Sequence, residues 1–193
     1  MRRISLLLSI PLAAGLILAG CIGKLPGSGA PPKLYDLTPK STFDQDLPKV
    51  SWQLIVQEPV AAANIDTARI IARQTPLTVE YYKGVAWIDR APRMVQTLII
   101  ESFERTNKIV SVGREAIGLR ADYTKGSVPS VLIRMNVKLI KMPERTIVGS
   151  ATFESRIETE GTSMEAIVTA YNEALGKVLK RTVEWTLRGG SSG

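Results

Sequence analysis

The chain has few residues of the types that most often bind metals or act as nucleophiles. Their scarcity excludes several classes of active site. The sequence has one cysteine, Cys21, and no histidine among its 193 residues. Zinc and related metals bind mainly through cysteine and histidine in proteins, so a metal site of that kind is excluded. Nucleophilic catalysis by a Ser-His-Asp or Cys-His arrangement is excluded as well. Catalysis by paired carboxylates does not depend on these residue types and stays open.

Cys21 follows a stretch that has the three parts of a secretory signal peptide. Two arginines start it, an apolar run covers residues 4–18, and two small residues precede the cysteine. A transmembrane helix needs about 20 apolar residues, and this run is shorter and is interrupted by a proline and a glycine. The sequence therefore predicts that residues 1–20 are a signal peptide.

The segment Leu18-Ala-Gly-Cys21 resembles the lipobox of bacterial lipoproteins. The resemblance implies a diacylglyceryl group on the Cys21 thiol, cleavage before this residue, and an acyl chain on the new amine. No other cofactor is expected. Three acyl chains exceed the two signals that stable anchoring requires, so Cys21 would moor the protein to one leaflet. The alternative is an ordinary signal peptide with a cysteine nearby by chance.

The rest of the chain has the length of one domain behind a tether. Residues 21–49 are predicted to hold the lipidated cysteine, a flexible Gly/Pro/Ser-rich tether and a first short strand. Residues 50–187 are predicted to form a single domain, and residues 188–193 a disordered tail. Removal of the two N-terminal arginines lowers the net charge from +7 to +5. The charges are scattered, which suits anionic head groups or an acidic protein partner better than nucleic acid.

Alternating apolar residues predict the strands of this domain. The clearest hairpin joins residues 131–141 to residues 146–158, with Ile147 among the residues expected to face inward. A second hairpin is expected from residues 69–73 and 77–82. Further strands are expected at residues 50–58, at residues 109–112 with Gly113 ending the strand, and at residues 119–123.

Two amphipathic helices are predicted to pack on the strands. The first begins after Asp89, a plausible N-cap, and ends near residues 106–107, with an apolar stripe of Met94, Val95, Leu98, Ile99 and Phe103. Gln96 is expected to face water. The second follows Gly161, with Thr162 and Glu165 at capping-box spacing. The expected fold is α/β, a mixed and largely antiparallel sheet packed by two main amphipathic helices in a single domain.

Candidate binding residues lie between the second predicted hairpin and the first helix. Tyr81, Tyr82 and Trp87 form the densest aromatic cluster of the chain, and Asp89 and Arg90 follow them. We predict that these five residues contribute to a partner-binding surface. Alternatively, the aromatic residues belong to the core and its rim, Asp89 caps the helix, and Arg90 is solvated.

Together, these segments resemble the auxiliary lipoproteins of ABC-type transport systems, the PqiC-like group. The segments that carry the resemblance follow one another in order behind the lipobox: Leu34-Tyr-Asp-Leu-Thr38, Trp52-Gln-Leu-Ile-Val56, Asp66-Thr-Ala-Arg-Ile70, Tyr81-Tyr82, Trp87-Ile-Asp-Arg-Ala-Pro92, Val112-Gly-Arg114 and Ala174-Leu-Gly-Lys-Val-Leu179. The chain departs from the group at residues 124–129, a short bridge where members usually carry a further strand and an acidic loop.

The resemblance implies a non-enzymatic accessory that helps to move lipids between membranes. Its partner would be the MCE-domain protein of an ABC lipid transporter, and a homo-oligomeric ring is one arrangement that the resemblance suggests. Ile22 after the cysteine, rather than aspartate, fits anchoring in the outer membrane with the domain facing the periplasm. The periplasmic leaflet of the inner membrane is the alternative location. Two other functions stay open, a direct periplasmic lipid carrier and a hydrolase that uses carboxylates alone.

Overall fold

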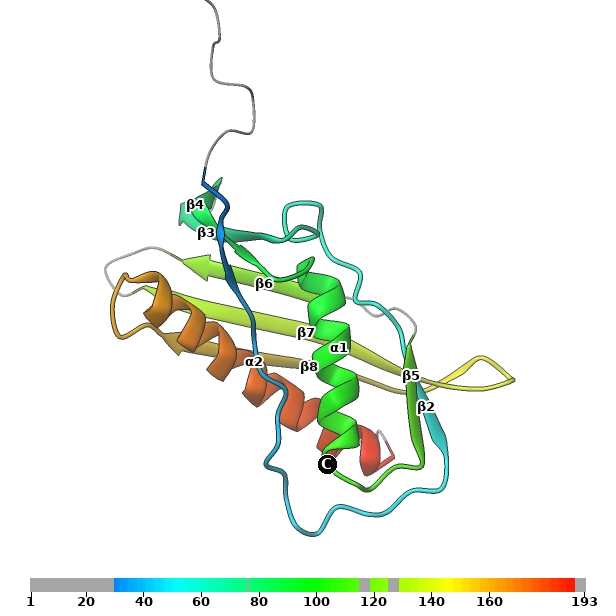
Figure 1. The fold of residues 1–193 in the computed structure, drawn as a ribbon. Coiled ribbons are helices and arrows are strands. Elements are labelled where there is room, and N and C mark those ends of the chain that lie inside the picture. The colour runs from blue at the N-terminus through cyan, green and yellow to red at the C-terminus, as the bar shows by residue number, and fades with distance from the viewer. Residues whose placement is uncertain (1–29, 76, 115–118, 125–128, 190–193) are drawn as a thin grey trace, which may run out of the picture. The chain divides into compact units, whose positions relative to one another are not determined.

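The computed structural model describes residues 30–75, 77–114, 119–124 and 129–189 (Figure 1). The predicted signal peptide, Cys21, the last residues of the tail and most of the short bridge at residues 124–129 lie outside the described residues. One compact unit begins at Pro32. The folded part therefore starts well before residue 50, where the sequence division placed the domain boundary.

The main sheet has six strands in the order β1-β4-β3-β6-β7-β8. Most neighbours are antiparallel, whereas β1 pairs with β4 and β3 pairs with β6 in parallel. A separate two-stranded parallel sheet joins β2 to β5. The fold class predicted from sequence is confirmed. The strands are β1 (Lys33–Tyr35), β2 (Gln53–Val56), β3 (Arg69–Thr75), β4 (Thr78–Trp87), β5 (Ser111–Arg114), β6 (Leu119–Thr124), β7 (Ser130–Lys141) and β8 (Thr146–Glu158).

Both predicted hairpins are present, and their faces follow the period of two that strands impose. Four alternate residues of β7 are buried, from Val131 to Val137, and they pack under α2 (Met164–Leu187). The inward orientation predicted for Ile147 is wrong, because it is exposed. A register shift after Leu139 places Ile147 opposite Ile140, and that pair lies outside the core.

The short strands differ more from the sequence predictions than the long hairpin strands do. The strand predicted at residues 50–58 is limited to β2, whose neighbour is β5 in the two-stranded sheet. Gly113 does not end β5 but lies within it, opposite Ile55. Strand β2 has one short partner strand, so few backbone hydrogen bonds are available to extend it. The alternation of apolar residues on either side is not enough to lengthen the strand.

Helix α1 (Ala91–Glu104) and helix α2 bury the apolar stripes that the sequence predicts. Gln96 is an exception to the prediction: it is 4% exposed, and its side-chain amide donates to the carbonyl oxygen of Val56 at 2.9 Å. This bond satisfies a buried amide and ties α1 to the end of β2. The helix therefore uses a polar side chain inside the core to fix the position of the small sheet.

The predicted caps of both helices are wrong by one or more residues. The N-cap of α1 is Arg90 without a side-chain cap, and the Asp89 carboxylate instead accepts from the Arg90 backbone N–H. The N-cap of α2 is Ser163, which accepts from the Ala166 N–H. Glu165 is consequently too early for a capping box and uses its carboxylate elsewhere.

Candidate functional site

Trp87, one of the five predicted binding residues, is part of the core. Its side chain is 6% exposed, and its ring meets Tyr171 of α2 edge to face, with 5.3 Å between the ring centroids. This geometry is typical of stabilising aromatic pairs. Burial therefore removes Trp87 from the surface that a partner could contact directly, and gives it a packing role between β4 and α2.

Tyr81 and Tyr82 are half-buried on β4. The guanidinium of Arg69 lies 3.6 Å from the centroid of the Tyr81 ring, and the Tyr81 hydroxyl donates to the carbonyl oxygen of Asn64. A cation stacked on an aromatic face stabilises the pair and shields part of the ring. Partner binding by the two tyrosines stays a prediction, because much of each side chain already has contacts within the fold.

Arg90 lies at an open surface hollow of about 300 Å³. The guanidinium forms an ion pair with Asp66 and lies 3.4 Å from a carboxylate oxygen of Glu58. The Asp66 carboxylate is the main cause that raises the pKa of Arg90 above its ordinary value. We call this site the Arg90 hollow; its lining residues are Glu58, Pro59, Val60, Ala61, Asp66 and Arg90.

The Arg90 hollow combines charged groups with an apolar edge. Its one cation already faces two carboxylates, and no thiol or hydroxyl group is among its lining residues. Val60, at its edge, is exposed. Arginine is enriched in protein interfaces, and here it lies beside an exposed apolar side chain. Of the predicted binding residues, Arg90 is the one that the structure places in such a surface.

A second site, which the sequence did not predict, joins the chain after the tether to α2. We call residues 33–49 the N-terminal arm. At its start, the Lys33 ammonium and the Tyr35 hydroxyl both donate to one carboxylate oxygen of Glu165, at 2.7 and 2.8 Å. Leu37 and Leu47 of the arm are buried in the core. The arm is thus held by apolar contacts as well as by charges.

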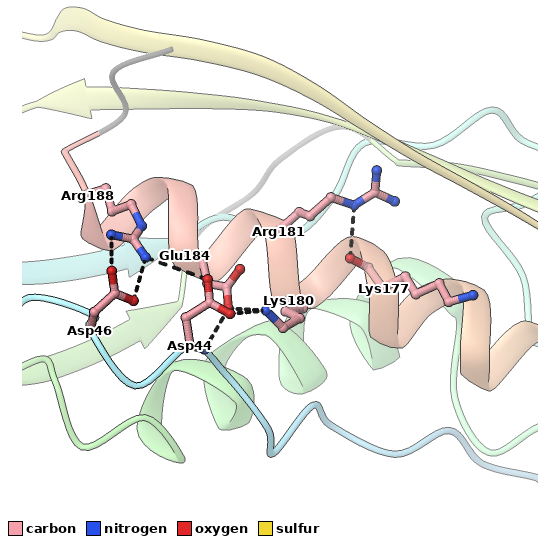
Figure 2. Close-up of polar contacts among 7 residues, drawn as sticks. All are labelled: Asp44, Asp46, Lys177, Lys180, Arg181, Glu184 and Arg188. Carbon is pink, nitrogen blue, oxygen red and sulfur yellow. Dashed lines mark hydrogen bonds and ion pairs between the residues drawn. The ribbon is translucent and has the colours of Figure 1, made fainter. Parts of the chain in front are cut away.

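Charged groups clamp the other end of the arm to the last turns of α2 (Figure 2). The Lys180 ammonium donates to Asp44 and to Glu184, at 2.6 Å each, and Glu184 accepts from the Asp44 backbone N–H at 2.9 Å. The two guanidinium nitrogens of Arg188 donate to the two carboxylate oxygens of Asp46. Hydrogen bonds from these cations lower the pKa of Asp44 and of Asp46. We call these contacts, with those of Glu165, the arm clamp.

The arm clamp had a faint signal in the sequence. The dipole at the C-terminus of α2 does not explain the basic side chains of this helix, because the helix continues to Leu187 and its last turn has no basic residue. Two carboxylates in a polar loop and basic residues on one helix are complementary in charge. Nothing local pairs them, since Asp44 and Lys180 are 136 positions apart.

We expect acid to release the start of the arm from α2. Hydrogen bonds from Lys33 and then Tyr35 lower the pKa of Glu165 from 4.5 to about 2. A carboxyl group with a lowered folded-state pKa contributes stability above its unfolded pKa, and this contribution is lost as the pH falls toward about 2. The pKa of Lys33 is raised to about 12, chiefly by Glu165, so the same contact is lost at the alkaline end only as the pH rises through about 12.

A carbon-detected NMR titration of the Glu165 carboxyl group, with the Tyr35 ring signals as a second probe, checks this expectation. In a Glu165→Gln variant the Tyr35 signals should not change between pH 5 and about 2 because the titrating acceptor is gone. A Glu165 carboxyl group that titrates near 4.5 in the folded protein would contradict the clamp.

An apolar cavity of about 30 Å³ lies between the helices and the sheet. Its lining includes Leu37 of the arm, Met94 of α1 and Leu175 of α2. That volume is about the share of one water molecule in the liquid. Within the described ranges, no three acidic side chains are grouped so that they could hold a metal ion. In the part of the chain that the structure describes, no helix is both long and apolar enough to cross a bilayer.

The chain is similar to proteins of one family and one fold. It matches the family model for the ABC-type transport auxiliary lipoprotein component over residues 35–183. The crystal structure of protein XCC0632 from Xanthomonas campestris is 34% identical with a TM-score of 0.76, over 81% of this chain and 95% of that chain. A second solved structure, of an uncharacterised protein, shares the fold at 9% identity with a TM-score of 0.56, over 84% of this chain and 100% of the other.

A curated relative, the uncharacterised protein bll6063 of Bradyrhizobium diazoefficiens, is 24% identical over 187 residues. The match covers 89% of this chain, and this chain spans about half, 49%, of the length of that relative. The family match begins at the last residue of β1 and ends within α2, so it includes most of the N-terminal arm, the Arg90 hollow and most of the arm clamp. The chain belongs to the family of ABC-type transport auxiliary lipoprotein components.

Proposed function

We propose that this protein is a non-enzymatic accessory of an MCE-type ABC transporter for lipids, anchored in the outer membrane through Cys21 and facing the periplasm. The family match over residues 35–183 is the observation that carries the proposal. The predicted lipobox supports the anchor, and the arm that follows the tether is fixed along α2 at both ends. The clamp fixes the point at which the tether leaves the domain, and the length of the tether sets how far the domain can lie from the membrane.

Three of the described carboxyl groups have a pKa that does not suit a general acid. A general acid at neutral pH needs a pKa raised toward 7. The carboxyl groups with a resolved shift are Asp44, Asp46 and Glu165, and cationic neighbours lower the pKa of each. These three are therefore poor general acids, and the proposal assigns them to the arm clamp instead.

The apolar cavity between the helices and the sheet is too small to enclose an acyl chain. A carrier must enclose an acyl chain, and small-molecule pockets typically measure about 300–1,000 Å³. The cavity between the helices and the sheet measures about 30 Å³. Native mass spectrometry of the mature chain with Cys21→Ser, purified without detergent, should therefore find protein without lipid; a bound phospholipid would favour the carrier.

Co-purification from detergent-solubilised envelopes tests the proposal. A tagged chain should retain the MCE-domain protein of the transporter, and density-gradient fractions should place it in the outer membrane. Deletion of the gene should weaken outer-membrane resistance to detergent. If no transporter component is retained and the deletion leaves this resistance unchanged, the proposed function is contradicted.

We expect Arg90→Ala to reduce this co-purification at least about fivefold with little loss of stability. The substitution removes the cation of the Arg90 hollow and leaves Asp66 and Glu58 to repel each other. Exposed ion pairs contribute about 0–1 kcal/mol, so the melting temperature should fall by only a few degrees. The comparison is quantitative immunoblotting of the retained MCE-domain protein.

Arg105→Ala is the matched control, because Arg105 is an exposed arginine at the other end of α1. It should retain the partner as well as the unmodified protein does. Equal retention by both variants would show that the Arg90 hollow is not the contact, even if the transporter association itself holds.

A further inference from the structure

The turn end of the β7–β8 hairpin exposes apolar side chains that no part of the described fold covers. We call residues 138–148 the hairpin tip. Four large apolar residues there are between 43% and 62% exposed: Ile140, Met142, Ile147 and Val148. They come from both strands and from the turn, so the apolar surface is not confined to one strand. Such a concentration of exposed apolar side chains marks an interaction site.

The hairpin tip is a projection of two strands. Strand β6 pairs with β7 only as far as Met135, and beyond this residue β8 is the partner of β7 in the described sheet. Figure 1 shows the yellow end of the hairpin extending past β6 and past the helices. A two-stranded ribbon is only marginally stable by itself in water, and contact with a further surface would stabilise it.

The charges of the hairpin tip indicate which surface this is. The hairpin tip has one acidic residue, Glu144, and three basic residues, Lys138, Lys141 and Arg145, so its net charge is +2. The ion pair of Lys141 with Glu144 is long, at 3.9 Å, and both side chains are largely exposed. Cations beside exposed apolar residues are the combination by which peripheral proteins bind anionic lipid: the apolar groups enter the interface, and the cations meet the phosphates.

We propose that the hairpin tip inserts into the surface of a bilayer that contains anionic phospholipid. The tip is convex, and a fluid bilayer accepts a convex projection without a preformed groove, whereas a protein partner would have to provide one. The tether of residues 22–32, behind the predicted anchor, spans at most about 40 Å, so the domain stays within reach of a membrane surface. This contact goes beyond the proposed function and can hold or fail independently of the transporter.

Sedimentation with vesicles tests the proposal directly. The protein is the mature chain from residue 21 with Cys21→Ser, which keeps every described residue and has no acyl anchor. We expect it to bind vesicles of phosphatidylethanolamine and phosphatidylglycerol, to bind phosphatidylcholine vesicles much less, and to lose affinity as salt is added. In a Met142→Ser/Ile147→Ser variant, the lipid concentration for half-binding should rise at least about tenfold.

Val110→Ser/Leu77→Ser is the matched control, because it removes two exposed apolar side chains at other loops. It should bind as the parent does, and thermal melts followed by circular dichroism should show that both double variants remain folded. The proposal is overturned if the parent fails to bind anionic vesicles, or if the two double variants bind equally. Equal binding to neutral vesicles would overturn the role of anionic lipid.

A fluorescent label provides a readout of insertion that does not depend on affinity. Cys21 is the only cysteine, so a Met142→Cys variant in the Cys21→Ser chain has a single thiol for an environment-sensitive fluorophore. Its emission should shift to shorter wavelength with anionic vesicles, whereas the same label at Leu77→Cys should not shift. An unshifted label at position 142 on bound protein would show that another surface makes the contact.

Discussion

Replacing Cys21 with serine is expected to release the mature protein from the membrane. Behind an ordinary cleavable signal peptide, the Cys21→Ser chain should be recovered in the soluble periplasmic fraction after a high-salt wash, with a more than tenfold drop in the membrane-bound fraction. The reason is that acyl chains contribute about 0.8 kcal/mol per buried CH₂ group, far more than the mild net charge of this chain supplies. Fractionation followed by immunoblotting measures the change.

The neighbouring residue provides the control for this prediction. Ile22→Asp keeps the thiol and therefore the acyl chains, so the protein should stay membrane-bound but move to the inner membrane if Ile22 permits release to the outer membrane. The salt wash separates acyl anchoring from the weaker contact proposed for the hairpin tip. A Cys21→Ser chain that remains in the washed membrane fraction would contradict lipid anchoring through this cysteine.

The parts of the fold that the sequence predicted are those that depend on local pattern. The β7–β8 hairpin alternates over two long runs, and the stripe from Ile167 to Val183 keeps one face of α2 in the core. The parallel pairings of β1 with β4 and of β3 with β6 have no such signal, because no turn connects the partners. Gln96 was misplaced because its partner, the Val56 carbonyl, is 40 positions away.

The functional sites also divide into those that local sequence pattern indicates and those that depend on distant contacts. The residue types at positions 81–90 indicated a surface of interest, and the structure does place Arg90 at a surface hollow. The arm clamp was missed because the ion pairs that connect the arm to the end of the chain join residues more than 130 positions apart, and complementary charge alone does not say which residues meet. The exposure of a side chain also depends on distant parts of the chain. Trp87 and Tyr81 belong to one strand, but of these two only Trp87 is buried, and it packs against α2.

The burial of Trp87 leads to a prediction about its contribution to stability. The Trp87→Ala variant should lose about 3–5 kcal/mol of its free energy of unfolding, because the substitution leaves a cavity and removes the edge contact with Tyr171. A typical domain has only about 5–15 kcal/mol in total, so the variant should be close to unfolding at 37 °C. Urea denaturation followed by circular dichroism measures the loss.

Trp52→Ala is the matched control, since Trp52 is 36% exposed and precedes β2. It should cost clearly less, because less apolar area leaves a buried environment. If Trp87→Ala were as stable as the parent and still failed to retain the transporter, Trp87 would be a binding residue after all. Loss of partner retention together with loss of folding is the expected result, and it would assign the effect of Trp87 to the packing of β4 against α2.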